Sequence, residues 1–155
     1  MTNFTIIRLP PDVTLDPAGL ARSPAPCRQR QLAHKISAGF PSPASDYIED
    51  GLDLNHYLVH NKTASFLFTV TGNSMSGAGI LDGDKVIVDR SVNPAHGKIV
   101  IAVINAEYTL KRLYNLQGII ELRAENETYP PIRLVEGQEL EIWGVVVGVV
   151  RKYRG

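Results

Sequence analysis

The sequence predicts a mainly β fold from residue 64 onward, preceded by an extended or flexible N-terminal arm. Runs rich in β-branched and aromatic residues follow one another in the C-terminal part, with turn residues between them. Seven of the ten prolines fall within the first 43 of the 155 residues. Because proline lacks a backbone donor and favours extended neighbours, a long helix is improbable there.

Charge divides the chain in a similar place. Residues 1–38 carry five basic and two acidic side chains, and residues 39–155 carry eleven basic and fourteen acidic ones. Such an asymmetry marks two regions with different roles. Together with the prolines, this divides the chain near residue 43. We expect an arm at residues 1–38 and one domain at residues 39–155, whose first part, residues 39–63, is a linker with a short helix.

Little regular structure is expected before the β region. Within the arm the pattern allows at most a short strand at Phe4–Leu9 and a short helix near Arg28–Lys35. In the linker, a brief helix is predicted at about Asp53–Val59. Asp53 is its expected N-cap, because a carboxylate can accept a free N–H of the first turn.

Six strands are predicted in the β region. They are Ala64–Thr71, Lys85–Asp89, Lys98–Ile104, Tyr108–Leu113, Ile119–Ala124 and Leu140–Val150. Asn105-Ala106 joins two of them as a tight hairpin, and Asp82-Gly83-Asp84 marks another turn. Gly144 and Gly148 interrupt the last run and suggest bends or bulges. Short strands with close turns favour a sandwich or a small barrel-like fold.

The sequence lacks the residues that several common metal- and phosphate-binding motifs require. One cysteine, Cys27, cannot supply a zinc-binding CxxC pair. Asp82-Gly83-Asp84 lacks the other ligand positions of a calcium loop, and Gly77-Ala78-Gly79 lacks the Lys-Ser/Thr of a P-loop. His56 and His60 have the i, i+4 spacing of metal ligands, but without a carboxylate motif nearby they are interpreted as surface histidines. No metal site is predicted.

The chain has the features of a cytoplasmic protein. No apolar run approaches the roughly 20 residues that span a bilayer. The N-terminus shows no basic segment followed by an apolar stretch, so no secretory signal is expected. A single cysteine cannot form an internal disulfide, which fits a reducing compartment.

Lys111 is a candidate general base. It lies in a predicted strand, where alternation places Thr109, Lys111 and Leu113 on one face and Leu110 and Arg112 on the other. Arg112 is then expected to point to solvent and Lys111 inward. A lysine accepts a proton only when neutral, and poising its pKa near 7 to 8 rather than about 10.4 costs about 3 to 5 kcal/mol. Burial is the usual means, so an inward lysine is a functional candidate.

Ser74 is the matching candidate nucleophile. A serine hydroxyl needs a base within hydrogen-bond reach, and Ser/Lys pairs are a known variant of the catalytic triad. Gly72 before it and Gly77 and Gly79 after it permit a sharp turn. Such a turn could aim the Ser74 backbone N–H at a developing oxyanion.

The motifs around these two residues resemble a known family. They are Gly72-Asn73-Ser74-Met75, Gly79-Ile80-Leu81-Asp82-Gly83-Asp84 and Thr109-Leu110-Lys111-Arg112-Leu113. In this order they look like the boxes of the LexA/UmuD family of self-cleaving Ser/Lys peptidases. The resemblance covers about residues 35–152 and is strongest to the UmuD branch, which Gly39-Phe40-Pro41-Ser42-Pro43-Ala44 also resembles.

The resemblance implies a fold, a reaction and partners. It implies a compact LexA-like domain of short twisted sheets, a nucleophilic Ser74, a general-base Lys111, and a scissile bond between Ala38 and Gly39, without a cofactor. It further implies that a RecA filament on single-stranded DNA promotes cleavage after DNA damage. The shortened chain, Gly39–Gly155, would form a homodimer that serves a UmuC-type Y-family DNA polymerase in translesion synthesis, in the bacterial cytoplasm. No membrane and no sequence-specific DNA binding are implied.

Other interpretations remain open at this stage. A LexA- or phage-type repressor needs a DNA-binding domain ahead of the cleavage bond, and a 38-residue segment with five prolines is not expected to supply one. A non-catalytic interaction module would make Ser74 and Lys111 relics. Whether the arm is cut in its own chain or by a dimer partner, and which polymerase is served, stays undecided.

Overall fold

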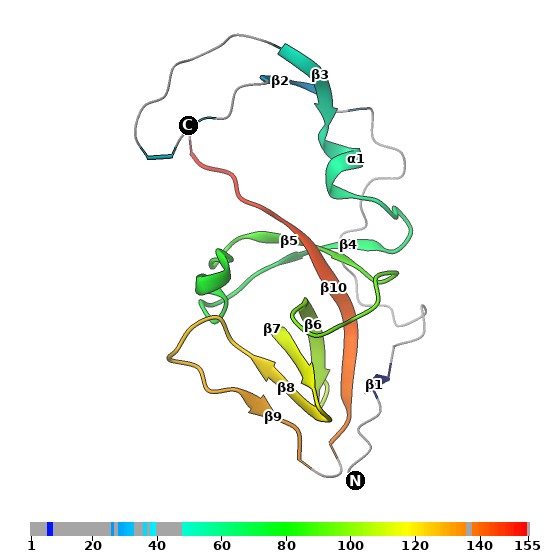
Figure 1. The fold of residues 1–155 in the computed structure, drawn as a ribbon, viewed down its shortest axis with the longest axis vertical. Helices are drawn as coiled ribbons and strands as arrows, with labels where there is room; N and C mark the ends of the chain where they lie inside the picture. Colours follow the sequence, from blue (N-terminus) through cyan, green and yellow to red (C-terminus); the bar gives the residue numbers. More distant parts are fainter. Residues whose placement is uncertain are drawn as a thin grey trace. The chain divides into compact units, whose positions relative to one another are not determined.

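The computed structural model describes residues 6–7, 26, 28–32, 36, 38–39, 48–135 and 138–154. The chain divides into two units, one of residues 21–60 and one that joins residues 1–20 to residues 61–155. The described residues are mainly β, as the sequence predicts, and the elements are drawn in Figure 1. Cys27 lies outside the described residues.

The smaller unit holds a two-stranded antiparallel sheet and one short helix. Strand β2 (Arg28–Leu32) pairs with β3 (Ile48–Asp53), and helix α1 (Leu54–Leu58) follows directly. The predicted helix near Arg28–Lys35 is therefore wrong over residues 28–32, because their backbone groups pair with β3 instead of with each other. The predicted helix after Asp53 is confirmed, since the Asn55 N–H donates to Asp53 Oδ1 at 3.0 Å.

The larger unit contains an eight-stranded sheet. In spatial order its main path is β4 (Ser65–Thr69), β5 (Lys85–Asp89), β10 (Leu140–Val150), β6 (Ile99–Ile104), β7 (Glu107–Leu116), β8 (Ile119–Arg123) and β9 (Ile132–Arg133), with β1 (Ile6–Ile7) beside β10. Neighbours on the main path are antiparallel, and β1 is parallel to β10. All six strands predicted in the β region are present.

Strand β10 connects the two halves of this sheet. Its first part pairs with β6 and its second part with β5 (Figure 1). The register shifts between Ile142 and Gly144 and again between Val146 and Gly148. The two glycines expected to bend the strand therefore lie at its two irregularities, where one strand changes partners.

Two turns follow from local chemistry. Asn105 and Ala106 both have positive φ, 49° and 65°, which a two-residue hairpin of type I′ requires. They join β6 to β7, so Lys111 is placed in register opposite Val100. The Asp82-Gly83-Asp84 turn is also present, with Gly83 at φ 84°. Both predicted turns are confirmed.

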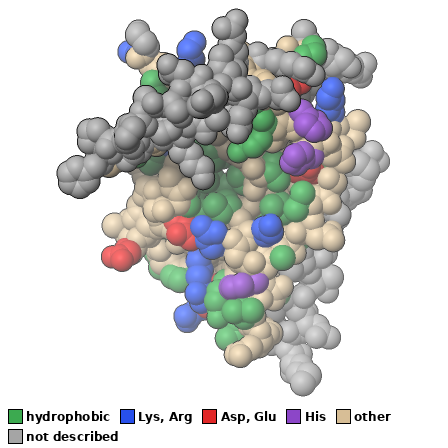
Figure 2. Space-filling view, turned by 45° about the horizontal axis from the view of Figure 1, so that its top comes forward, with side chains coloured by type: hydrophobic (Ala, Val, Ile, Leu, Met, Phe, Trp, Pro, Cys, Tyr) green, Lys and Arg blue, Asp and Glu red, His purple; other side chains and the backbone are tan. Residues whose placement is uncertain are grey.

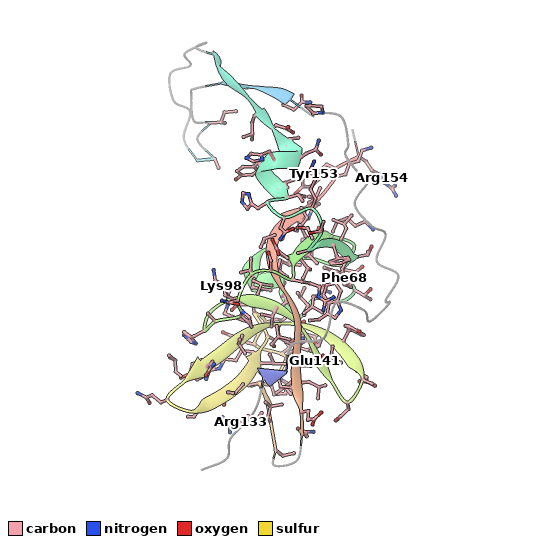
Figure 3. The ribbon with its side chains drawn as sticks, turned by 90° about the vertical axis from the view of Figure 1, so that its right-hand side faces the viewer. Phe68, Lys98, Arg133, Glu141, Tyr153 and Arg154 are labelled. Atoms are coloured by element: carbon pink, nitrogen blue, oxygen red, sulfur yellow. The ribbon has the colours of Figure 1, made fainter. Side chains whose placement is uncertain are left out.

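Two apolar clusters cover opposite faces of β6. Val100 and Ala102 belong to the first cluster and Ile101 to the second. The first also contains Leu113, Leu122, Leu134, Leu140, Ile142 and Val145. The second contains Met75, Ile80, Val86, Val88 and Trp143. Phe68, labelled in Figure 3, meets the Trp143 ring edge-on with centroids 4.9 Å apart. Because both faces of β6 are buried, its sequence is a continuous apolar run.

Candidate active site

Ser74 and Lys111 meet although 37 residues separate them. Lys111 comes from β7, and Ser74 lies in the loop between β4 and β5, directly before a short 3₁₀ helix, η1 (Ser76–Ala78). The Lys111 Nζ lies 2.9 Å from the Ser74 Oγ, within hydrogen-bond distance. The two candidates that the sequence singled out are therefore in direct contact.

Lys111 is buried, with 8% of its surface exposed. It shares its strand face with Leu113, as the alternation predicts, and its Nζ also contacts Thr109 Oγ1 and the Leu110 carbonyl, both at 3.0 Å. None of the ion pairs among the described residues includes Lys111. Burial lowers the pKa of Lys111 because the ammonium loses water that no carboxylate replaces.

The three contacts of Lys111 are compatible with a neutral amine as well as with an ammonium. A neutral lysine has two N–H groups and one lone pair, whereas an ammonium has three N–H groups. The Leu110 carbonyl can only accept, and the Thr109 hydroxyl is able to accept, so these neighbours take the two N–H groups. As an ammonium, Lys111 donates its third N–H to Ser74 Oγ; as a neutral amine it can instead accept from the Ser74 hydroxyl, which is able to donate. The geometry thus permits transfer of the Ser74 proton to Lys111.

Arg112, next along β7, lies on the face opposite Lys111 as predicted, and 36% of its side chain is exposed, but its guanidinium also has two protein partners. It donates from Nη1 to the Gly97 carbonyl at 2.7 Å and from Nε to the Glu125 carboxylate. Alternation assigned the face but did not indicate these partners, which lie 13 and 15 residues away in the sequence. Leu110, on the same face of β7 as Arg112, is partly buried against the second apolar cluster.

Glycines shape the Ser74 loop. Gly72, at φ 88°, donates its N–H to Asp82 Oδ1 at 2.7 Å, and Gly79, at φ 77°, ends η1. Both angles lie in the region that favours glycine. Met75, 1% exposed, anchors the loop in the second apolar cluster. The sharp turn expected around Ser74 is present. It places the Ser74 side chain, one residue before Met75, beside Lys111.

A second segment, just after β8, holds this loop by backbone hydrogen bonds. The Glu125 N–H donates to the Ser74 carbonyl at 2.9 Å, and the Gly77 N–H donates to the Glu125 carbonyl at 2.6 Å. Asn126 Nδ2 adds a bond to the Asn73 carbonyl at 2.9 Å. Neither residue is predicted from the sequence, because no local pattern shows which distant backbone a loop will pair with.

Arg151 holds the end of the same loop. Its Nε and Nη2 donate to the two carboxylate oxygens of Asp84, at 2.6 and 2.5 Å, and Nη2 also donates to the Gly79 carbonyl at 2.8 Å. Asp84 Oδ2 accepts the Leu81 N–H at 2.8 Å. The Arg151 hydrogen bond, followed by the Leu81 N–H, lowers the pKa of Asp84 to about 2. The sequence does not predict this contact either.

Two N–H groups next to the Ser74 hydroxyl remain open. Within the part of the chain that the structure describes, the backbone N–H groups of Ser74 and Met75 have no protein acceptor, whereas those of the next five residues donate to carbonyls of this loop or to Glu125. An acceptor brought to Ser74 Oγ would find them nearby. Open backbone donors beside a nucleophile are what an oxyanion site requires.

The other residues selected from the sequence lie in the smaller unit. Ala38 and Gly39 are both exposed and form a bend. His56 and His60 are exposed as predicted, with ring centroids 6.2 Å apart. Among the described residues, no group of three or more His, Cys, Asp or Glu side chains could hold a metal ion. Nor is any described helix long and apolar enough to cross a bilayer.

Comparison with known proteins places the chain among peptidases. Residues 31–147 match the model of the Peptidase S24-like family. Protein ImpA of Salmonella typhimurium is 42% identical over 123 residues, which cover 79% of this chain and 83% of that protein. Protein MucA of Escherichia coli is 42% identical over 113 residues, or 72% of this chain and 77% of that protein.

A repressor is also among the relatives. The LexA repressor of Clostridium perfringens is 42% identical over 123 residues, which cover 79% of this chain and 59% of that protein. The family match spans most of the chain and includes both Ser74 and Lys111. The resemblance that the motifs indicated is thereby confirmed. The chain belongs to the Peptidase S24-like family, whose members are self-cleaving serine peptidases.

Proposed function

We propose that this chain is a serine endopeptidase that cuts its own Ala38–Gly39 bond, with Ser74 as nucleophile and Lys111 as general base. The observation that carries the proposal is the 2.9 Å contact between a buried lysine amine and the serine hydroxyl, in a chain of the S24 family. A nucleophile in hydrogen-bond contact with a base whose pKa is lowered is the signature of an activated serine.

The first half of the reaction transfers the peptide to the enzyme. Neutral Lys111 takes the proton of Ser74 as Oγ attacks the Ala38 carbonyl carbon. The carbonyl oxygen becomes an oxyanion, which the N–H groups of Ser74 and Met75 stabilise. The C–N bond to Gly39 then breaks, and the Lys111 ammonium returns the proton to the departing Gly39 amine. Ala38 remains bound to Ser74 as an ester.

Water completes the reaction. Neutral Lys111 takes a proton from a water molecule that attacks the ester carbonyl, and Ser74 recovers its proton as the bond to Ala38 breaks. Thr109 and the Leu110 carbonyl hold the amine in place through both halves. Because the substrate belongs to the protein itself, its effective concentration is high and no separate tight-binding pocket is required.

The product is proposed to act through its partners. Cleavage removes residues 1–38 and leaves residues 39–155 as the peptidase and dimerisation domain. In this proposal a RecA filament on single-stranded DNA promotes cleavage in the bacterial cytoplasm after DNA damage. The shortened homodimer is then an accessory subunit of a UmuC-type DNA polymerase in translesion synthesis. The motif resemblance to the UmuD branch and the LexA relative support this SOS role.

The test is the mass of the products. Purified full-length chain is incubated at alkaline pH, beside Ser74→Ala and Lys111→Ala, and the fragments are weighed by mass spectrometry. We expect a cut after Ala38 in wild type alone. If wild type stays whole, with and without RecA filaments, the peptidase function fails and a non-catalytic interaction module becomes the better interpretation.

A further inference from the structure

One residue joins the strand of Lys111 to the loop of Ser74. Arg112 follows Lys111 on β7, and its guanidinium bridges the Gly97 carbonyl and the Glu125 carboxylate. Both side chains of the ion pair are partly exposed, Arg112 by 36% and Glu125 by 30%. The pair therefore belongs neither to the apolar core nor to the freely solvated surface.

Glu125 holds the Ser74 loop by its backbone while its side chain holds β7. Its N–H binds the Ser74 carbonyl, and its carbonyl binds the Gly77 N–H. The bonds lie on either side of Met75, so the short segment that contains Ser74 is fixed at both ends. A displacement of Glu125 would move the nucleophile with it.

The backbone pairing between β7 and β8 does not extend as far as Glu125. Strands β7 and β8 pair from Leu116 and Ile119 up to Arg112 and Arg123, where the ladder ends. Glu125 lies two residues beyond that last pair, where the chain turns away toward Asn126. The Arg112–Glu125 ion pair thus extends the connection between β7 and the following segment past the end of the sheet.

We propose that Arg112 and Glu125 are positioning residues for self-cleavage, which tie the strand of Lys111 to the loop of Ser74 and so keep Nζ and Oγ in contact. The inference rests on the proposed function of that pair. Neither residue touches the reacting atoms. Because a misplacement of about 1 Å can cost about a hundredfold in rate, while an exposed ion pair contributes little to global stability, the effect on cleavage should exceed the effect on stability.

The first experiment is a double-mutant cycle in the cleavage rate. Arg112→Ala, Glu125→Gln and the double variant are compared with wild type at alkaline pH. We expect each single change to slow cleavage at least about tenfold, and the double change to slow it no further than either single one. Melting of each variant, followed by Trp143 fluorescence, should show a folded protein.

Arg133→Ala is the matched control. Arg133 also forms an ion pair with a glutamate of this sheet, Glu121, at 2.8 Å, but that pair involves neither β7 nor the Ser74 loop. Basic and acidic side chains lie next to one another on the face drawn in Figure 2, and Figure 3 labels Arg133. The control should cleave at the wild-type rate. A rate as low as that of Arg112→Ala would overturn the inference.

The second experiment does not depend on cleavage. The pKa of Lys111 is measured by NMR from its ¹³Cε resonance, assigned with Lys111→Arg, in a Gly39→Pro background that keeps the chain intact. If the pair positions the site, Glu125→Gln loosens the loop, hydrates Lys111 and raises its pKa. If Glu125 acts only through its charge, its neutralisation lowers the pKa of Lys111 instead, because a nearby negative charge favours the ammonium.

The outcomes separate the two proposals. Wild-type cleavage rates in both single variants, or a lower Lys111 pKa in Glu125→Gln, would overturn the positioning role and leave the proposed function intact. A wild-type chain that does not cleave would overturn the proposed function, and the Lys111 titration would still decide whether Arg112 and Glu125 fix the Ser74–Lys111 contact.

Discussion

Replacing Gly77 by alanine adds one methyl group where the Ser74 loop packs against Glu125, and so tests the geometry of that loop. A Cβ at this position would lie 2.5 Å from the Glu125 carbonyl oxygen, the same atom that accepts the Gly77 N–H. Real Cβ contacts essentially never fall under 3.0 Å, and ordinary ones begin at 3.4 Å. Gly77→Ala must therefore push the loop and Glu125 apart by roughly 0.5 to 0.9 Å.

The rate effect follows from that displacement. Since a shift of about 1 Å can cost about a hundredfold, we expect Gly77→Ala to slow self-cleavage by about ten- to a hundredfold. Overpacking of this kind destabilises by about 1 to 3 kcal/mol, which is less than the usual stability of a domain, about 5 to 15 kcal/mol. The variant should therefore stay folded. The assay is the rate at which full-length chain disappears, followed by mass spectrometry.

Gly118→Ala provides the control. Gly118 lies in the β7–β8 turn at φ 78°, with nothing within 4 Å of a Cβ placed there. Its replacement strains the backbone by about 1 to 2 kcal/mol without touching the Ser74 loop, so it matches the destabilisation of Gly77→Ala. Cleavage at the wild-type rate is expected. Equal rates for Gly77→Ala and wild type, or equal losses in both variants, would refute the reasoning.

Three further predictions concern stability. Lys111→Met should melt at a higher temperature than wild type near neutral pH, because burial lowers the pKa of Lys111 and the folded chain then disfavours its charge. The difference in melting temperature between the two proteins should shrink as pH rises toward the ordinary lysine pKa of 10.5. A difference that stays constant over this range would contradict a lowered pKa of Lys111. Asp84→Asn should melt lower at neutral pH, because Asp84 has its pKa lowered from 3.8 to about 2 and its charge stabilises the fold fully only above 3.8. That difference should shrink in thermal melts as pH falls from 3.8 toward 2, and a difference that persists would count against the Arg151 contact. Ala106→Gly should raise the free energy of unfolding in urea by about 0.5 to 1 kcal/mol, because Ala106 has φ 65°; no gain would mean that the hairpin bears no strain.

The sequence predicted features that depend on neighbours along the chain. Strand runs, the Asn105-Ala106 hairpin and the Asp53 cap each follow from a few adjacent residues, and the structure contains them. The contact between Ser74 and Lys111 was anticipated because strand parity turned the lysine inward and motif order paired it with the serine.

Features that depend on distant partners were missed. Arg28–Leu32 was predicted as helix because its pairing with β3 leaves no local trace. Glu125 and Arg151, which hold the Ser74 loop, are separated from it by dozens of residues and carry no recognisable spacing. Local propensity is a weak guide where tertiary contacts decide. These contacts nevertheless position the predicted serine.

The dependence of the cleavage rate on pH tests the Ser74–Lys111 mechanism most directly. Full-length chain is incubated at closely spaced values from about pH 6 to about pH 10.5, and the first-order rate is compared with the pKa of Lys111 measured by NMR. The mechanism predicts a rate that rises tenfold per pH unit and levels off at the pKa of Lys111, below the ordinary value of 10.5. A rate that is flat across this range, or that levels off at a pH where Lys111 does not titrate, would contradict Lys111 as the base.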